Sequence, residues 1–185
     1  LREPEGRGGS RHFCDVVAAG DTIHMAGPKN LFRLDESALR HVLIAGGIGI
    51  TPILAMADRL KALGKPYALH YAARSRAHMA LLARVQRDHG DHLSLHVSEE
   101  GRRMQLGTLL ANVGGGTQVY GCGPERLIDA LQALGEGWPE GTLHVEHFSA
   151  EGSLLDPARE HAFEAVLKDS GTTVTVAANQ TLLQA

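Results

Sequence analysis

The chain has 185 residues, of which 43% are hydrophobic and 21% charged, so it can bury a sizeable core as one or two domains. Its formal net charge of −3 gives no basic surface for nucleic acid, and no apolar run is long enough to cross a bilayer. The two cysteines, Cys14 and Cys122, argue against a disulfide framework and favour a reducing compartment, so we expect a cytoplasmic protein. The 11 histidines show no metal-ligand spacing, so no metal site is predicted.

A loop rich in glycine and charge (EGRGGSRH) lies near the start of the chain. Gly8, Gly9 and Ser10 offer backbone N–H groups and a hydroxyl to an anion, and Ser10 is a good cap for a short helix running through Cys14 to Ala18. The loop therefore fits a phosphate, although its composition fits a polar linker equally well.

The stretch HVLIAGGIGITP, residues 41–52, organises the rest of the sequence. Its aliphatic and β-branched residues predict a strand buried on both faces of a parallel sheet, and its glycines predict a tight turn that a ligand can approach. The residues expected to face that ligand are Gly46, Gly47, Gly49, Thr51 and Pro52. Thr51 is a good N-cap and Pro52 a good first helical residue. Because Pro52 stands where G-x-G-x-x-G would place its third glycine, a corner whose glycines serve packing only is the alternative.

Strands and helices alternate after this corner. A strand at 21–26 precedes it, and the further predicted strands are 67–73, 93–97, 118–121 and 143–146. The predicted helices are 52–63, 77–89 and 125–134, with a short helix or loop at 104–112. This order predicts an α/β nucleotide-binding domain with a five-stranded parallel sheet flanked by helices.

Arg74 and Ser75 follow the second strand of this sheet, where a Rossmann domain carries an acid for the adenosine ribose. These two residues could instead meet a ribose hydroxyl or a 2′-phosphate, so the arginine favours NADP. A solvated arginine at a strand end is the alternative.

A second strand-turn-helix corner is predicted at Cys122, Gly123 and Pro124. Open α/β sheets place ligands at the carboxyl edge of their strands, so the two corners should lie side by side there. A buried structural cysteine is the alternative for Cys122. The last strand of the sheet ends at Glu146, and Phe148 follows it.

The remaining sequence predicts a linker and then a hairpin. Segments 163–167 and 173–176 should pair across a turn at 169–171, and such a hairpin is only marginally stable by itself. Because Leu1 is not a start methionine and residues 179–185 read like a helix just beginning, we expect a piece of a longer protein.

Four motifs in this order carry a family resemblance: REPEGRGGSRH, HVLIAGGIGITPILAMADRL, VYGCGPERLIDAL and LHVEHF. They resemble the reductases of the phthalate dioxygenase reductase type, within the ferredoxin-NADP reductase superfamily. The resemblance implies an oxidoreductase that passes electrons from NADH through FMN to a plant-type [2Fe-2S] centre. The partner would be an oxygenase of the aromatic-ring dioxygenase or O-demethylase type, or its ferredoxin.

The same resemblance implies roles for individual residues. Gly8, Gly9 and Ser10 would grip the flavin phosphate. Cys122 would lie beside the reacting nicotinamide carbon, Phe148 on the flavin ring and Glu146 next to the site, and NAD is favoured over NADP.

The implied domains are the end of a flavin barrel (1–38), an NAD-binding domain (39–149), a linker (150–160) and the start of a [2Fe-2S] ferredoxin-like β-grasp domain (161–185). Since a plant-type cluster needs four thiolates, this chain cannot hold one and is expected to be inactive alone. A cluster-free flavin reductase or electron-transfer subunit is one alternative, and a nucleotide-binding module without redox activity is another.

Overall fold

The computed structural model describes residues 8–25, 27, 29–148, 161–166 and 171–178. The chain divides into two compact units, Leu1–Arg33 and Leu34–Ala185, and each is described by itself. The predicted linker at 150–160, part of the hairpin turn and residues 179–185 lie outside the described residues.

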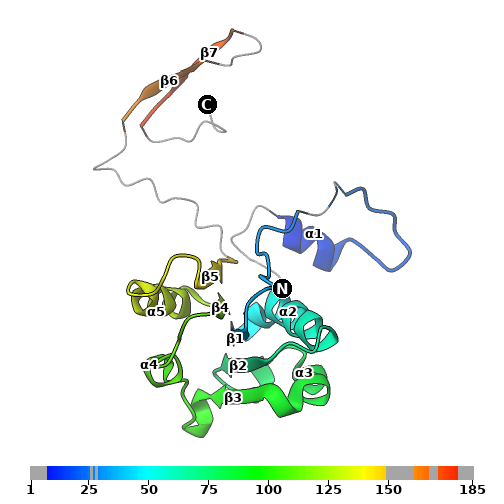
Figure 1. Cartoon of the computed structure of the whole chain (residues 1–185). Helices are drawn as coiled ribbons and strands as arrows, with labels where there is room; N and C mark the ends of the chain where they lie inside the picture. The colour runs from blue at the N-terminus through cyan, green and yellow to red at the C-terminus, as the bar shows by residue number, and fades with distance from the viewer. Residues whose placement is uncertain (1–7, 26, 28, 149–160, 167–170, 179–185) are drawn as a thin grey trace. The chain divides into compact units, whose positions relative to one another are not determined.

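A five-stranded parallel sheet forms the centre of the second unit, with strand order β3-β2-β1-β4-β5. Its strands are β1 (Arg40–Gly46), β2 (Tyr67–Ala73), β3 (Leu93–Val97), β4 (Thr117–Cys122) and β5 (Leu143–Glu146). The α-helices are α2 (Ile50–Ala62), α3 (Leu82–His89), α4 (Leu106–Leu109) and α5 (Glu125–Gly135). Helices α2 and α3 cover one face of the sheet and α4 and α5 the other (Figure 1). The predicted fold class is confirmed.

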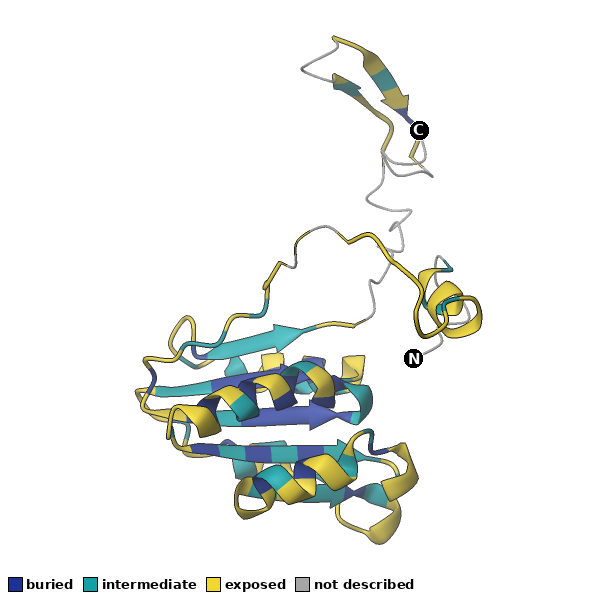
Figure 2. Ribbon diagram, turned by 90° about the vertical axis from the view of Figure 1, so that its right-hand side faces the viewer, coloured by how far each residue is buried: buried dark blue, intermediate teal, exposed yellow. Residues whose placement is uncertain are grey.

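The core is densest around β1, which lies in the middle of the sheet. Leu43, Ile44 and Ala45 are completely buried, and α2 adds Ile53 and Leu60, which are also completely buried. Figure 2 shows the buried residues gathered on the central strands and on the helix faces that contact them. Each large side chain buried here contributes about 1.5–3 kcal/mol to the free energy of unfolding. A central strand that is buried on both faces therefore has a continuous apolar run, as β1 does.

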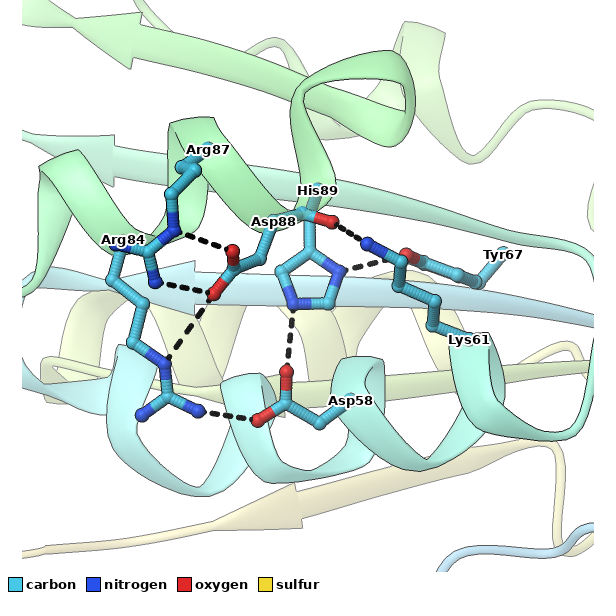
Figure 3. Close-up of polar contacts among 7 residues, drawn as sticks. All are labelled: Asp58, Lys61, Tyr67, Arg84, Arg87, Asp88 and His89. Carbon is cyan, nitrogen blue, oxygen red and sulfur yellow. Dashed lines mark hydrogen bonds and ion pairs between the residues drawn. The ribbon is translucent and has the colours of Figure 1, made fainter.

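A polar network ties the helices of one face together near the amino end of β2 (Figure 3). Tyr67 donates its hydroxyl hydrogen to Nδ1 of the buried His89 (2.7 Å), and Nε2 of His89 donates to Oδ1 of Asp58 (2.9 Å). Burial raises the pKa of Tyr67, which keeps its hydroxyl protonated. Arg84 donates to the other oxygen of Asp58 at 2.6 Å. The network therefore joins α2, α3 and β2 while satisfying a buried imidazole.

The first unit contains the helix α1 (Gly9–Asp15), which differs from the prediction. Ser10 lies inside this helix and does not cap it. The helix begins before the predicted cap. Gly8 is the N-cap, with a left-handed backbone at φ 90°, and its carbonyl accepts the N–H of His12 at 2.9 Å.

The predicted strand at 21–26 is wrong, since residues 21–25 have no regular secondary structure. An extended segment becomes a strand only when a neighbour accepts its backbone hydrogen bonds. Among the described residues, no strand pairs with this segment.

The predicted start of α2 at Pro52 is also wrong. Gly47, at φ 54°, opens a 3₁₀ turn (Gly47–Gly49) directly after β1, so the α-helix already begins at Ile50. Thr51 lies in the first turn and donates its hydroxyl to the carbonyl of Ile48 at 3.1 Å, so it is not the N-cap.

The predicted helix at 77–89 is shorter in the structure. A 3₁₀ turn (Arg76–His78) follows β2, and α3 begins only at Leu82, after Leu81 at φ 57°. The predicted hairpin does form: β6 (Phe163–Val166) and β7 (Thr173–Val176) pair antiparallel. Within the described ranges, no helix has the length and apolar character needed to cross a membrane.

Candidate functional site

Two sharp bends meet at the carboxyl edge of the sheet: the first bend is residues 46–51 after β1, and the second bend is residues 122–124 after β4. Strands β1 and β4 are neighbours, with Ala45 opposite Cys122. This position is the topological switch point, because the chain leaves β1 toward β2 and β3 and later returns to its other side. The expectation that the two bends lie side by side is confirmed.

The bends approach so closely because they carry glycine. A Cβ on Gly49 would lie 2.2 Å from the carbonyl oxygen of Cys122, and a Cβ on Gly123 would lie 2.9 Å from Cα of Gly46. A Cβ on Gly46 would meet the side chain of Pro124 at 2.7 Å. Three of the predicted site glycines thus serve the packing of one bend on the other, which was the alternative for this corner.

Gly47 differs from these three glycines. Its φ is 54°, and a Cβ built on it would have no neighbour within 4 Å. It therefore combines a left-handed backbone with open space at the start of the 3₁₀ turn (Gly47–Gly49) that leads into α2. Because the N–H of Ile50, the first residue of α2, already donates to the carbonyl of Gly47, an anionic ligand of the first bend would be met by this 3₁₀ turn.

Cys122 forms the wall of the second bend and is completely buried. Burial raises the pKa of its thiol to about 12, and the carboxylate of Glu146 adds to the rise. Glu146 lies opposite Cys122 on the neighbouring strand β5. A thiol with so high a pKa stays neutral and is a poor nucleophile, so Cys122 is not suited to covalent chemistry.

Phe148 lies two residues beyond β5 with 46% of its surface exposed. Its exposed ring is available to a flat ligand. Gly8, Gly9 and Ser10 belong to the other unit, and a Cβ on Gly8 or Gly9 would have no neighbour within 4 Å. Among the described residues, no group of three or more His, Cys, Asp or Glu is placed to hold a metal ion.

Arg74 and Ser75 lie at the same sheet edge, just after β2. Nε of Arg74 donates to Oε1 of Glu99 at 2.9 Å, and Oγ of Ser75 lies 2.7 Å from Nδ1 of His78. Sequence analysis missed Glu99, which follows the neighbouring strand β3. The sequence SEE directly follows the predicted strand 93–97, and this position could have predicted carboxylates at the carboxyl edge of the sheet.

Comparison with known proteins gives consistent matches. The family described as "Dimethylamine monooxygenase subunit DmmA-like, N-terminal domain" matches residues 26–139. Phenoxybenzoate dioxygenase subunit beta of Ectopseudomonas oleovorans is 43% identical over 185 residues, which are 100% of this chain and 57% of that protein. The chain thus spans little more than half of this curated relative.

Two solved structures are similar over the whole chain. An intact type IV self-sufficient cytochrome P450 monooxygenase is 54% identical with a TM-score of 0.85, over 100% of this chain and 24% of that one. Phthalate dioxygenase reductase, described as a modular structure for electron transfer from pyridine nucleotides to [2Fe-2S], is 34% identical. Its TM-score is 0.76, over 99% of this chain and 58% of that one.

Gly49→Ala should destabilise the fold, because the new methyl would overlap the backbone carbonyl of Cys122. We expect the free energy of unfolding, measured in urea, to fall by about 1–3 kcal/mol or more. Gly90→Ala is the matched control, since Gly90 also has a helix-like φ (−49°) but no neighbour within 4 Å of a Cβ. Equal stability of the two variants would contradict the packing role.

The two cysteines should react very differently with Ellman's reagent at pH 8. The exposed Cys14 should react in the folded chain, whereas the buried thiol of Cys122 should react only after unfolding in guanidinium. The variant Cys14→Ser should therefore show no fast thiol. Rapid labelling of that variant would show that Cys122 is accessible.

Proposed function

Because the chain belongs to the dimethylamine monooxygenase subunit DmmA-like family, we propose that it is the pyridine-nucleotide-binding part of an oxygenase reductase. The resemblance to the phthalate dioxygenase reductase type, drawn from four sequence motifs, is confirmed by the similarity to that protein over 99% of the chain. The proposed activity is that of an NADH-dependent flavin and iron–sulfur oxidoreductase.

The observation that carries this proposal is the meeting of the two bends at the switch point, with Gly47 facing open space. The residues fit a dinucleotide: the open backbone at Gly47 and the N-terminus of α2 suit the pyrophosphate, and Cys122 suits the nicotinamide ring. When bound, NADH supplies the electrons. The chain would hold the ring in position and keep a neutral thiol beside it.

The flavin side of the proposal rests on the sequence resemblance, which assigns Phe148 to the flavin ring and Gly8, Gly9 and Ser10 to the FMN phosphate. In the first unit, Gly8 is the N-cap of α1 and Ser10 lies in its first turn. The resemblance assigns Glu146, which lies opposite Cys122, as a polar neighbour of the site. We assign 1–38 to the end of the flavin barrel and 39–149 to the NAD-binding domain.

A plant-type [2Fe-2S] centre needs four thiolates, and the chain has two cysteines, so its residues do not fit the cluster. The proposal assigns the cluster to a ferredoxin-like domain that begins with β6 and β7 (161–185), after a linker at 150–160. Since the name of one relative is that of a dioxygenase subunit, we propose an oxygenase or its ferredoxin as the partner. The reducing cytoplasm, where NADH is available, is the proposed compartment.

Gly47→Leu should abolish NADH binding, because the new side chain fills the open space that the ligand needs. Gly64→Leu is the matched control: Gly64 has a similar φ (64°) and equally open surroundings, but it follows the C-terminus of α2 at the other edge of the sheet. Both variants carry about 1–2 kcal/mol of the same backbone strain.

Titration calorimetry with NADH, together with far-UV circular dichroism, separates binding from folding. We expect the Gly64→Leu variant to bind like the unchanged chain and the Gly47→Leu variant to keep its helical signal without binding. Unchanged affinity in the Gly47→Leu variant would remove the first bend from the site and favour a corner that serves packing alone.

A further inference from the structure

Two histidines from neighbouring strands face each other on the sheet. His70 lies in the middle of β2 and His96 is the second-last residue of β3, and the two strands are parallel neighbours (Figure 1). Nδ1 of His70 lies 3.3 Å from Nε2 of His96. We call these two residues the histidine pair. They are 26 positions apart in the sequence, so they meet only because β2 pairs with β3.

The register of the two strands places both rings on one face of the sheet. His96 is opposite Ala72, which lies two residues after His70, and alternate residues of a strand point to the same side. Ser94, the residue opposite His70, is on this face too and is exposed. The neighbours of the histidine pair on the two strands are therefore small. Since both imidazoles are only half-buried, an ion can reach them from solvent.

The separation of the two facing nitrogens suits a shared zinc ion. Two Zn–N bonds of about 2.0–2.1 Å at the tetrahedral angle place their nitrogens about 3.3 Å apart. In the folded chain, one hydrogen can lie between Nδ1 of His70 and Nε2 of His96. When that proton moves to the other nitrogen of its own ring, both facing nitrogens offer a lone pair. The ring planes are inclined at 36°, and the broad χ2 torsion of histidine lets each ring turn toward the ion.

Both rings are uncharged at neutral pH in the folded chain. Burial lowers the pKa of His70 to about 4, and the neighbouring His96 adds to this fall. Burial also lowers the pKa of His96. Neutral imidazole is a common ligand of zinc, copper and nickel, whereas Mg²⁺ and Ca²⁺ prefer oxygen ligands. The chemistry of the histidine pair therefore favours a transition-metal ion.

We propose that His70 and His96 bind a divalent transition-metal ion, and that Zn²⁺ is the ion that fits their separation. Among the described residues, no third His, Cys, Asp or Glu completes the group, so water fills the remaining positions of the ion. Binding is weaker than at zinc sites with three or four protein ligands. The ion links β2 to β3 through side chains. This site is independent of the proposed function, because neither histidine belongs to the two bends.

The test compares two variants in a Cys14→Ser background, which removes an exposed thiol that could also bind zinc. The double variant is His70→Asn with His96→Gln. Its amides stand near the positions of Nδ1 and Nε2, so a hydrogen bond between the strands can persist while both imidazoles are lost. His144→Gln is the matched control. His144 is a half-buried histidine of the same sheet, and its Nε2 lies 2.7 Å from the amide oxygen of Gln118 instead of a second imidazole.

Calorimetric titration with zinc chloride measures affinity and stoichiometry, and circular dichroism checks folding. We expect the background chain and the His144→Gln variant to bind one Zn²⁺ at least about tenfold more tightly than the double variant does. Magnesium chloride should give no binding at this site. Zinc should raise the unfolding temperature of the background chain and of the control but not that of the double variant, because an ion that binds the folded chain stabilises it.

Nuclear magnetic resonance of the histidine rings gives a readout in the background chain itself, whether or not the double variant folds. The ¹⁵N resonances of Nδ1 of His70 and Nε2 of His96 should shift together as one equivalent of zinc is added. If both stay unchanged, or if the folded double variant binds zinc as tightly as the background chain, the histidine pair is an interstrand hydrogen bond only and the proposal is overturned. Neither result affects the proposed function, which depends on NADH at the two bends.

Discussion

The backbone contact between the two bends is the constraint on which the rest of this structure depends. With the Cβ position of Gly49 only 2.2 Å from the carbonyl oxygen of Cys122, no other residue fits there without moving a main chain. This contact brings the start of α2, the start of α5 and the ends of β1 and β4 to one place. Gly46 and Gly49 serve the packing of the two bends, whereas Gly47 is the glycine of the first bend whose Cβ position has no neighbour within 4 Å.

The amino and carboxyl edges of the sheet differ in the polar contacts of their side chains. Near the amino end of β2, the buried His89 is satisfied by Tyr67 and Asp58. At the carboxyl edge, Arg74 and Glu99 form an exposed ion pair.

Much of the fold could be predicted from the sequence. Strands β2, β3 and β5 have the predicted bounds. The strands of a parallel sheet are apolar runs bounded by turn residues, so both ends of each strand can be read from the sequence. The start of α2 was misplaced because the left-handed backbone of Gly47 is not visible in residue types such as Thr51. The strand at 21–26 failed for a different reason: a strand depends on its neighbours as much as on its own residues.

The candidate site was predictable only in part, for similar reasons. The two bends follow from local sequence, but Glu99 reaches Arg74 across 25 positions, and such a pair becomes visible only when β2 and β3 lie side by side. The buried environment that raises the pKa of Cys122 likewise depends on residues from β4 and β5 together. The sequence could identify Arg74 and Cys122 as candidate site residues, but not the side chains that contact them in the folded chain.

The most direct test of the central claim is amide chemical-shift mapping of the ¹⁵N-labelled chain during titration with NADH. The account predicts that the largest shifts fall on the backbone amides of Gly47, Ile48, Gly49 and Gly123, while those of Gly64 and Gly90, away from the two bends, do not move. Shifts confined to the amino edge, or none at saturating NADH, would contradict it.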